Sequence, residues 1–257
     1  MMAKENKLQS VERAFSVIEL LDVYGELGVT EIGKRLSLDK STAFRVLATL
    51  RSLGYIVQNP SSSKYYNSYK LFEIGTSVAR RTGLPKLAHP YMLELSQLTG
   101  EAVNLAIRDG TQALYLSKIE STDTIKVCMN LGQTIPLYCT GLGKALIAYC
   151  SEEEVREIFR EQHFFRYTAR TFTDIPSLLV DLEKIRSCGY SIDNEEHIKG
   201  IHCIAAPVFD SSKNVLAAIS IALPQFRFEE MDDEERLNYL VRDVARRFSA
   251  SLGSREP

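Results

Sequence analysis

Apolar positions in the first seventy residues recur at helical spacing and then give way to two short runs. Residues 10–24 and 39–52 each place apolar side chains three and four positions apart, and a short helix beginning at Thr30 lies between them. Asp39 is a suitable N-cap for the third helix. The segment 55–70 holds two strand-like runs around an Asn-Pro-Ser turn. The pattern predicts three helices followed by a β-hairpin.

The face of the third helix opposite its apolar side is short and polar. At about 100° per residue, Ser41 and Arg45 lie on that face, away from Leu47. A helix that enters a major groove needs small side chains for close approach and an arginine that can bind a guanine edge. A three-helix domain with another role would share the apolar pattern, but it would not need this face together with a basic hairpin. The predicted contacts to DNA bases and phosphates are Thr30, Lys40, Ser41, Thr42, Arg45, Lys64 and Tyr65.

Beyond residue 70 two helical stretches, 71–82 and 86–99, precede a region whose apolar period is two. Strands are expected at 103–107, 113–120, 125–132, 202–209 and 215–223, with helices at 151–160, 177–189 and 232–252. Strands in groups with helices between them predict a mainly antiparallel sheet flanked by helices, which is an α+β fold. We expect a DNA-binding domain at 1–70, a linker helix at 71–85 and a larger domain at 86–257.

The larger domain carries features of a ligand pocket. Gly141, Leu142 and Gly143 lie between an apolar strand and a helix, where backbone N–H groups can face an anion, although a tight turn explains the glycines equally well. The spacing does not match a Walker loop. Ser220 and Ala222 share one face of their strand, and small side chains there leave either a cavity or a close helix contact.

Acidic residues precede the last two strands. Asp193, Glu195 and Glu196 could accept hydrogen bonds from ligand hydroxyls, but an ordinary surface position is the alternative for Glu195 and Glu196.

Composition limits the class of protein. The chain has 257 residues, of which 45% are hydrophobic, so we expect one or two globular domains. No run is long and apolar enough for a membrane helix, and the first ten residues lack a signal-peptide core, so the expectation is a soluble, cytoplasmic protein. Residues 1–80 carry a net charge of +3 and the remainder −5. A cationic end suggests a polyanionic partner, and a solvated face is the alternative.

Neither catalysis nor a cofactor is predicted. Five cysteines form no C-x-x-C pair, so they do not indicate a disulfide framework. His202 and Cys203 are adjacent in a strand and point to opposite faces, so they cannot act as a thiol–imidazole pair. Cysteines 128, 139 and 203 and histidines 197 and 202 lack compact metal-ligand spacing, and we expect no metal. An enzyme with a fused DNA-binding domain and a metal-sensing regulator remain alternative hypotheses.

Motifs along almost the whole chain resemble the IclR-type bacterial transcriptional regulators. The residues that carry the resemblance are V-E-R-A-F-S-V-I-E-L-L, L-D-K-S-T-A-F-R-V-L-A-T-L, L-G-Y-I-V, T-G-L-G-K-A-L-I-A, D-N-E-E-H-I-K-G-I-H-C-I-A-A-P-V-F-D and A-I-S-I. Within the family, Y-K-L-F-E-I-G, Y-L-S-K-I-E-S and I-P-L-Y-C-T-G-L-G-K are most similar to 2-keto-3-deoxygluconate repressors.

The resemblance implies a winged helix-turn-helix domain, a linker helix and a GAF-like α/β effector domain. It implies homodimers or homotetramers on palindromic double-stranded operators and a small carboxylate effector. Together with the glycine loop, it places the effector on Gly141, Leu142, Gly143, Asp193, Cys203, Ser220 and Ala222. Many relatives carry serine where this chain has Ala222, and arginine is frequent where it has His202.

Overall fold

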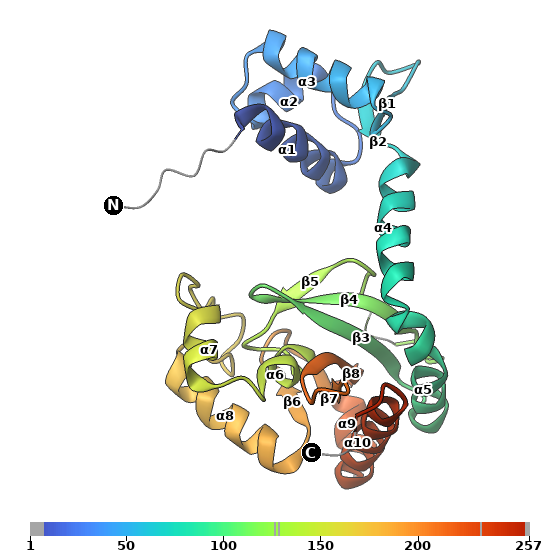
Figure 1. Cartoon of the computed structure of the whole chain (residues 1–257), viewed down its shortest axis with the longest axis vertical. Coiled ribbons are helices and arrows are strands. Elements are labelled where there is room, and N and C mark those ends of the chain that lie inside the picture. The colour runs from blue at the N-terminus through green and yellow to red at the C-terminus, as the bar shows by residue number, and fades with distance from the viewer. Residues whose placement is uncertain (1–7, 126, 128, 232, 255–257) are drawn as a thin grey trace. The chain divides into compact units, whose positions relative to one another are not determined.

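The computed structural model describes residues 8–125, 127, 129–231 and 233–254, and the chain divides into two compact units (Figure 1). The first unit is residues 1–82 and the second is residues 83–257. This boundary falls inside the segment expected as a linker. Helix α4 (Tyr69–Thr82) therefore belongs to the first unit, and helix α5 (Leu84–Thr99) opens the second.

The first unit has the predicted order of three helices and a hairpin. Helices α1 (Gln9–Tyr24), α2 (Val29–Arg35) and α3 (Lys40–Ser52) are followed by strands β1 (Ile56–Gln58) and β2 (Tyr65–Asn67). The two strands pair antiparallel. One apolar cluster holds the unit together, and its buried members are Val17, Leu21, Leu27, Ile32, Leu47, Leu50, Ile56 and Tyr65.

The second unit is built on a six-stranded sheet in which every neighbouring pair is antiparallel, as predicted. Its strands are β3 (Ala102–Asp109), β4 (Gln112–Ile119), β5 (Thr134–Pro136), β6 (Ser191–Asn194), β7 (Ile201–Phe209) and β8 (Val215–Pro224), in the order β5-β4-β3-β8-β7-β6. Chain-distant strands β3 and β8 therefore meet at the centre of the sheet.

Some sequence expectations in this unit were wrong. The described residues of the segment 125–132 are not a strand, and positions 126 and 128 lie outside the described residues. The strand that pairs with β4 is β5. Strand β6 and helix α9 (Gln225–Met231) were not expected from the sequence.

Helices cover the two faces of the sheet with different partners (Figure 1). Helices α5 and α10 (Glu234–Ser251) pack on one face around a large apolar cluster. Helices α6 (Gly141–Ile147), α7 (Glu152–Ile158) and α8 (Ile175–Cys188) belong to the cluster on the other face. The predicted alternation of β8 is confirmed, because Ile219 and Ile221 join the first cluster and Ala218 the second.

Among the described residues, no helix combines the length and apolar character that crossing a membrane requires.

Candidate functional site

The exposed face of helix α3 carries the side chains predicted to contact DNA. Ser41 and Arg45 are exposed, whereas Leu47 is fully buried beneath them. Asp39 caps the helix, because its Oδ1 accepts hydrogen bonds from the Thr42 N–H at 2.9 Å and from the Ser41 hydroxyl at 2.5 Å. These bonds hold the pKa of Asp39 far below its ordinary value. The cap fixes the first turn of α3 and leaves the arginine free to reach outward.

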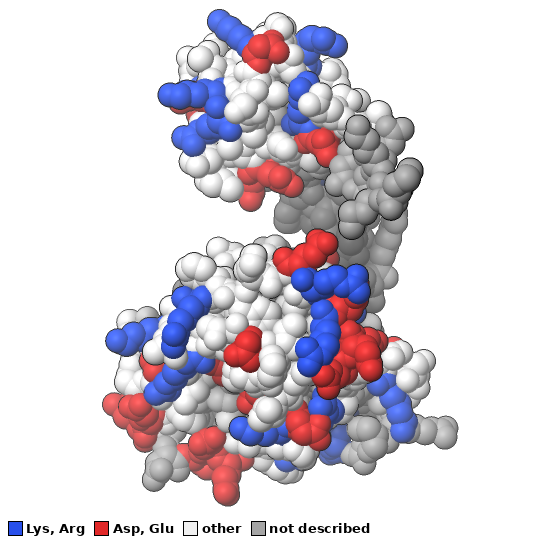
Figure 2. Space-filling model, turned by 90° about the vertical axis from the view of Figure 1, so that its left-hand side faces the viewer, with Lys and Arg blue, Asp and Glu red and all other residues white. Residues whose placement is uncertain are grey.

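The other predicted DNA contacts of α2, α3 and the hairpin, apart from Tyr65, are also on the surface. Thr30 lies exposed in the first turn of α2, and Lys40 is the exposed first residue of α3. Lys64 lies at the hairpin with its Nζ 3.5 Å from a carboxylate oxygen of Glu31. Figure 2 shows lysine and arginine side chains spread over the visible face of the N-terminal unit.

The prediction for Tyr65 needs correction. Its ring is 3% exposed and belongs to the apolar cluster of the first unit. Its backbone N–H and C=O pair with the C=O and N–H of Leu27. A side chain packed in the core cannot contact a phosphate, and the exposed tyrosine of this strand is Tyr66.

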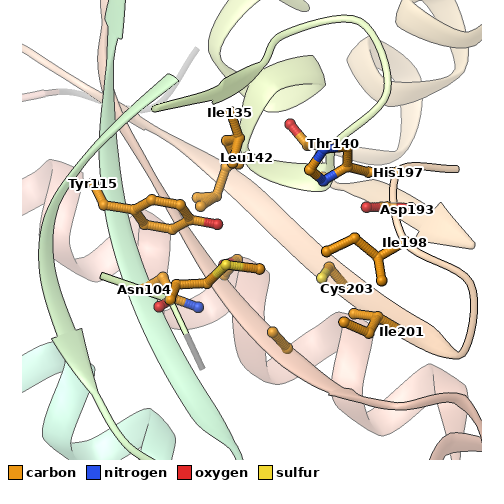
Figure 3. A pocket seen from close by; sticks show the side chains of 14 residues that line it. Asn104, Tyr115, Ile135, Thr140, Leu142, Asp193, His197, Ile198, Ile201 and Cys203 are labelled. Atoms are coloured by element: carbon orange, nitrogen blue, oxygen red, sulfur yellow. The ribbon is translucent and has the colours of Figure 1, made fainter. Parts of the chain in front are cut away.

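A cavity lies in the second unit between the sheet and the start of α6 (Figure 3). The volume of the cavity is about 20 Å³. Its lining residues are Asn104, Tyr115, Met129, Ile135, Thr140, Gly141, Leu142, Asp193, His197, Ile198, Ile201, Cys203, Ser220 and Ala222. The cavity is therefore narrow, and it combines an apolar rim with a few polar groups.

Six of the seven predicted effector residues line this cavity. Strand register explains how Cys203, Ser220 and Ala222 meet. Cys203 lies opposite Ala222, and Ser220 lies two residue pairs further along the same two strands, opposite Ala205. Gly141 lies against Cys203, where a Cβ atom on the glycine would be 3.4 Å from the cysteine Cβ. The small side chains thus serve both expected purposes, a cavity and a close helix contact.

Gly143 does not line the cavity, and its N–H is not free to bind an anion. That N–H donates to the Thr140 hydroxyl at 3.1 Å as part of the cap of α6. A Cβ atom at position 143 would lie 2.4 Å from the Cα of Leu137. The glycine is needed for close backbone approach, which is the tight-turn alternative.

Asp193 is the buried acid of the cavity. It lies at the end of β6, opposite Cys203, and its Oδ1 accepts a hydrogen bond from the Glu196 N–H at 2.7 Å. Burial raises its pKa to about 6. Burial likewise raises the pKa of the Cys203 thiol, so the thiol stays protonated near neutral pH.

A buried lysine behind the cavity was missed by the sequence reasoning. The Lys144 Nζ lies 2.8 Å from Asp181 and 2.6 Å from Glu196, with only 1% of its side chain exposed. Burial among carboxylates raises the pKa of Glu196 to about 7. The expectation that Glu196 is a surface acid was wrong, whereas Glu195 is partly exposed. The signal that was overlooked is a lysine inside an otherwise apolar helix, K-A-L-I-A.

Catalytic and metal alternatives gain no support from the described part of the chain. His202 and Cys203 face opposite sides of the sheet: the cysteine lines the cavity, and the histidine ring stacks on Phe228 at 3.6 Å. Among the described residues, no group of three or more histidine, cysteine or acidic side chains could hold a metal ion. Cys128 lies outside those residues.

A winged helix-turn-helix unit and an α+β unit with a partly polar cavity together define a DNA-binding transcriptional regulator with a ligand-binding domain. The chain belongs to the IclR family: residues 10–60 match the IclR helix-turn-helix domain, and residues 76–250 match the family described as bacterial transcriptional regulator IclR C-terminal.

Similar proteins carry regulator names. The chain is 37% identical to the HTH-type transcriptional regulator KdgR of Escherichia coli K12, over 96% of this chain and 94% of that one. It is 35% identical to the HTH-type transcriptional repressor AllR of Escherichia coli K12, over 95% of this chain and 90% of the repressor. Both names agree with the family to which the chain belongs, which is one of bacterial transcriptional regulators.

Solved structures support the same fold. The crystal structure of the Thermotoga maritima IclR has a TM-score of 0.77 at 30% identity, covering 96% of this chain and all of the other. The C-terminal domain of Escherichia coli KdgR has a TM-score of 0.60 at 37% identity, covering 66% of this chain and 98% of that domain.

Proposed function

We propose that this regulator represses genes of sugar-acid catabolism and that a small hydroxylated carboxylate, such as 2-keto-3-deoxygluconate, sets its affinity for DNA. The observation that carries the proposal is the cavity of the second unit, where buried Asp193 faces a space that Ser220 also lines. The 37% identity to KdgR, together with the resemblance to 2-keto-3-deoxygluconate repressors, favours this effector class.

Each polar group of the cavity has a part in holding such a ligand. Asp193 accepts a hydrogen bond from a ligand hydroxyl, and Ser220 donates or accepts another. The first N–H groups of α6, at Gly141 and Leu142, have no carbonyl within their own helix to bind, so they can donate to the carboxylate. The cavity is narrow as it stands, so the ligand must push its walls apart. We expect the N-terminal DNA-binding unit to respond to this movement of the cavity walls.

The N-terminal unit supplies the DNA contacts in this proposal. Helix α3 enters the major groove with Ser41, Thr42 and Arg45 toward the bases, while Thr30, Lys40 and Lys64 bind phosphates. The protein then acts where bacterial DNA is found, in the cytoplasm.

A second copy of the chain completes the proposed DNA-binding species. Phe15 on α1 and Phe72 on α4 are 61% and 71% exposed, and Tyr69 at the start of α4 is more exposed still. Large apolar side chains in such number on one small unit are typical of an interaction surface. We assign these side chains to a homodimer or homotetramer whose two-fold symmetry matches a palindromic operator.

Two measurements test the proposal. Selection of bound DNA from a random pool, with and without sugar acids, should return a palindromic site whose recovery changes with the ligand. Calorimetry with the purified protein should show binding of 2-keto-3-deoxygluconate that is weakened in Asp193→Ala and in Ser220→Val. Undiminished binding in both variants would show that the ligand does not bind in this cavity.

A further inference from the structure

Two buried polar side chains of the cavity were not expected from the sequence. Asn104 on β3 is 3% exposed and Tyr115 on β4 is 5% exposed, and both line the cavity. Among the hydrogen bonds of the described residues none involves the Asn104 carboxamide or the Tyr115 hydroxyl, and neither group is a sealed, unpaired polar atom, so both open onto the cavity. Figure 3 shows the Tyr115 ring reaching in from the side opposite Asp193, with its hydroxyl toward the middle of the space.

Strand register places these groups beside the predicted effector residues. Asn104 lies directly opposite Ser220 in the β3–β8 pair. Tyr115 pairs with Ala106 on β3, two residues further along from Asn104. The sheet therefore presents an amide, a phenol and a hydroxyl on one continuous floor, while Asp193 and Cys203 lie toward its β6–β7 edge.

Polar groups buried in this way need partners. Unpaired buried donors and acceptors cost free energy, so native proteins pair nearly all of them. Other polar groups of the wall are paired: the Thr140 hydroxyl donates to Pro136 and accepts from Gly143, and Asp193 accepts from Glu196. A ligand that fills the cavity and displaces water must supply hydrogen bonds to the remaining ones.

We propose that Asn104 and Tyr115 form a second polar wall that recognises the hydroxyl-bearing chain of the effector, so that the protein selects polyhydroxylated acids over short keto acids. The inference rests on the proposed function and deepens it. Carboxamide and phenol groups both donate and accept, which suits hydroxyls of either orientation. Burial raises the pKa of Tyr115, so its hydroxyl remains a neutral donor at physiological pH.

The chemistry also explains why a short acid is rejected. Pyruvate offers a carboxylate and a keto group but no hydroxyl-bearing chain. It would leave the amide and the phenol without partners, and sites built to bind a hydroxyl discriminate strongly against analogues that lack it.

The test is calorimetry on the full-length protein with 2-keto-3-deoxygluconate and pyruvate as probes. Tyr115→Phe removes one oxygen and keeps the ring, and Asn104→Leu keeps the approximate size of the side chain. Each should weaken 2-keto-3-deoxygluconate about threefold to tenfold and leave pyruvate within about twofold. Matched controls are Tyr149→Phe and Asn238→Leu, which lie in the same unit outside the cavity lining and should change neither affinity.

The outcomes separate the two proposals. If the wild type binds 2-keto-3-deoxygluconate and both variants bind it equally well, the second wall is refuted and the proposed function stands. If the variants lose both probes in parallel, they alter the shape of the cavity, and selection by this wall is again refuted. If the wild type binds neither probe, the proposed effector class fails and the second wall fails with it. Should Asn104→Leu not fold in a thermal unfolding control, Tyr115→Phe decides alone.

Discussion

At the scale of single residues, the local pattern predicts which face of a helix or strand a side chain occupies. Contacts with residues distant in the sequence decide the cases that this pattern cannot. The exposed positions of Ser41 and Arg45 follow from helical periodicity. The shared position of Ser220 and Ala222 in the cavity wall follows from strand alternation. The prediction for Tyr65 was wrong because its backbone pairs with Leu27, which is distant in the sequence, and its ring packs into the apolar core.

Lys144 is the clearest case of a residue whose role depends on distant partners. Its two carboxylates come from α8 and from the loop after β6. We expect Lys144→Met to lower the free energy of unfolding by about 3–5 kcal/mol, because it leaves buried carboxylate charge unpaired. Urea unfolding measures the change. Lys118→Met is the control, since its pair with Glu120 is more exposed and should contribute about 1 kcal/mol or less. Equal losses in the two variants would contradict this role.

Arg45 gives the prediction for DNA recognition. Replacing it with alanine should weaken binding to the selected operator by about 1–3 kcal/mol and relax the preference at one base position. Gel shifts on a series of single-base operator variants measure both effects. Arg156→Ala removes an arginine of the other unit that is also exposed and should leave the affinity unchanged. An unaltered base preference in Arg45→Ala would show that α3 does not present this residue to the bases.

His202 makes stability depend on pH. Burial against Phe228 lowers its pKa to about 4, from 6.5, so the folded protein binds fewer protons than the unfolded chain between these values. The stabilisation from neutral His202 is therefore present above pH 6.5 and declines as the pH falls toward 4. The difference in unfolding free energy between wild type and His202→Gln should shrink over that range in urea titrations. A difference independent of pH would mean that the histidine charges freely in the folded state.

At the scale of elements, the length of a segment separates the helices and strands that could be predicted from those that could not. Helices α1, α3 and α10 are long, periodic segments, and the sequence locates them within a few residues. The three-residue strand β5 lies in the apolar run that the sequence placed before the glycine turn of α6. The four-residue strand β6 was missed because it depends on pairing with β7, and a segment of that length has no local signal that distinguishes a strand from a loop.

Helix α6 illustrates how one element places a site. Its cap residue Thr140 bonds to Gly143, and the turn brings that glycine against the backbone of Leu137. We expect Gly143→Ala to destabilise the protein by about 1–3 kcal/mol or more, because the added methyl group cannot fit without moving the backbone. Gly75→Ala is the matched control: a Cβ atom at this helical position has open space around it and should be neutral or slightly stabilising. Thermal unfolding compares the two. A tolerated alanine at 143 would show that α6 shifts easily.

At the scale of the whole molecule, the two units divide the work of regulation. Each unit has its own apolar core, and the boundary between residues 82 and 83 lies within the segment predicted as a linker. If the effector changes DNA affinity by some factor, DNA must change effector affinity by the same factor.

This reciprocity provides a prediction for a truncated chain. Residues 83–257 alone should bind 2-keto-3-deoxygluconate with an affinity that operator DNA does not alter, whereas the affinity of the full-length protein should change when DNA is added. Calorimetry on both forms, with and without operator, measures the effect. A truncated chain that folds and yet binds no ligand would show that the cavity depends on the first unit.

The protonated thiols beside the cavity have one more consequence. Peroxide and electrophiles attack thiolates, and burial raises the pKa of both Cys139 and Cys203. These two sulfur atoms therefore resist oxidation under conditions that modify exposed, ionised cysteines. Oxidants that modify exposed thiolates would therefore leave Cys203, in the wall of the proposed effector cavity, and Cys139 unchanged.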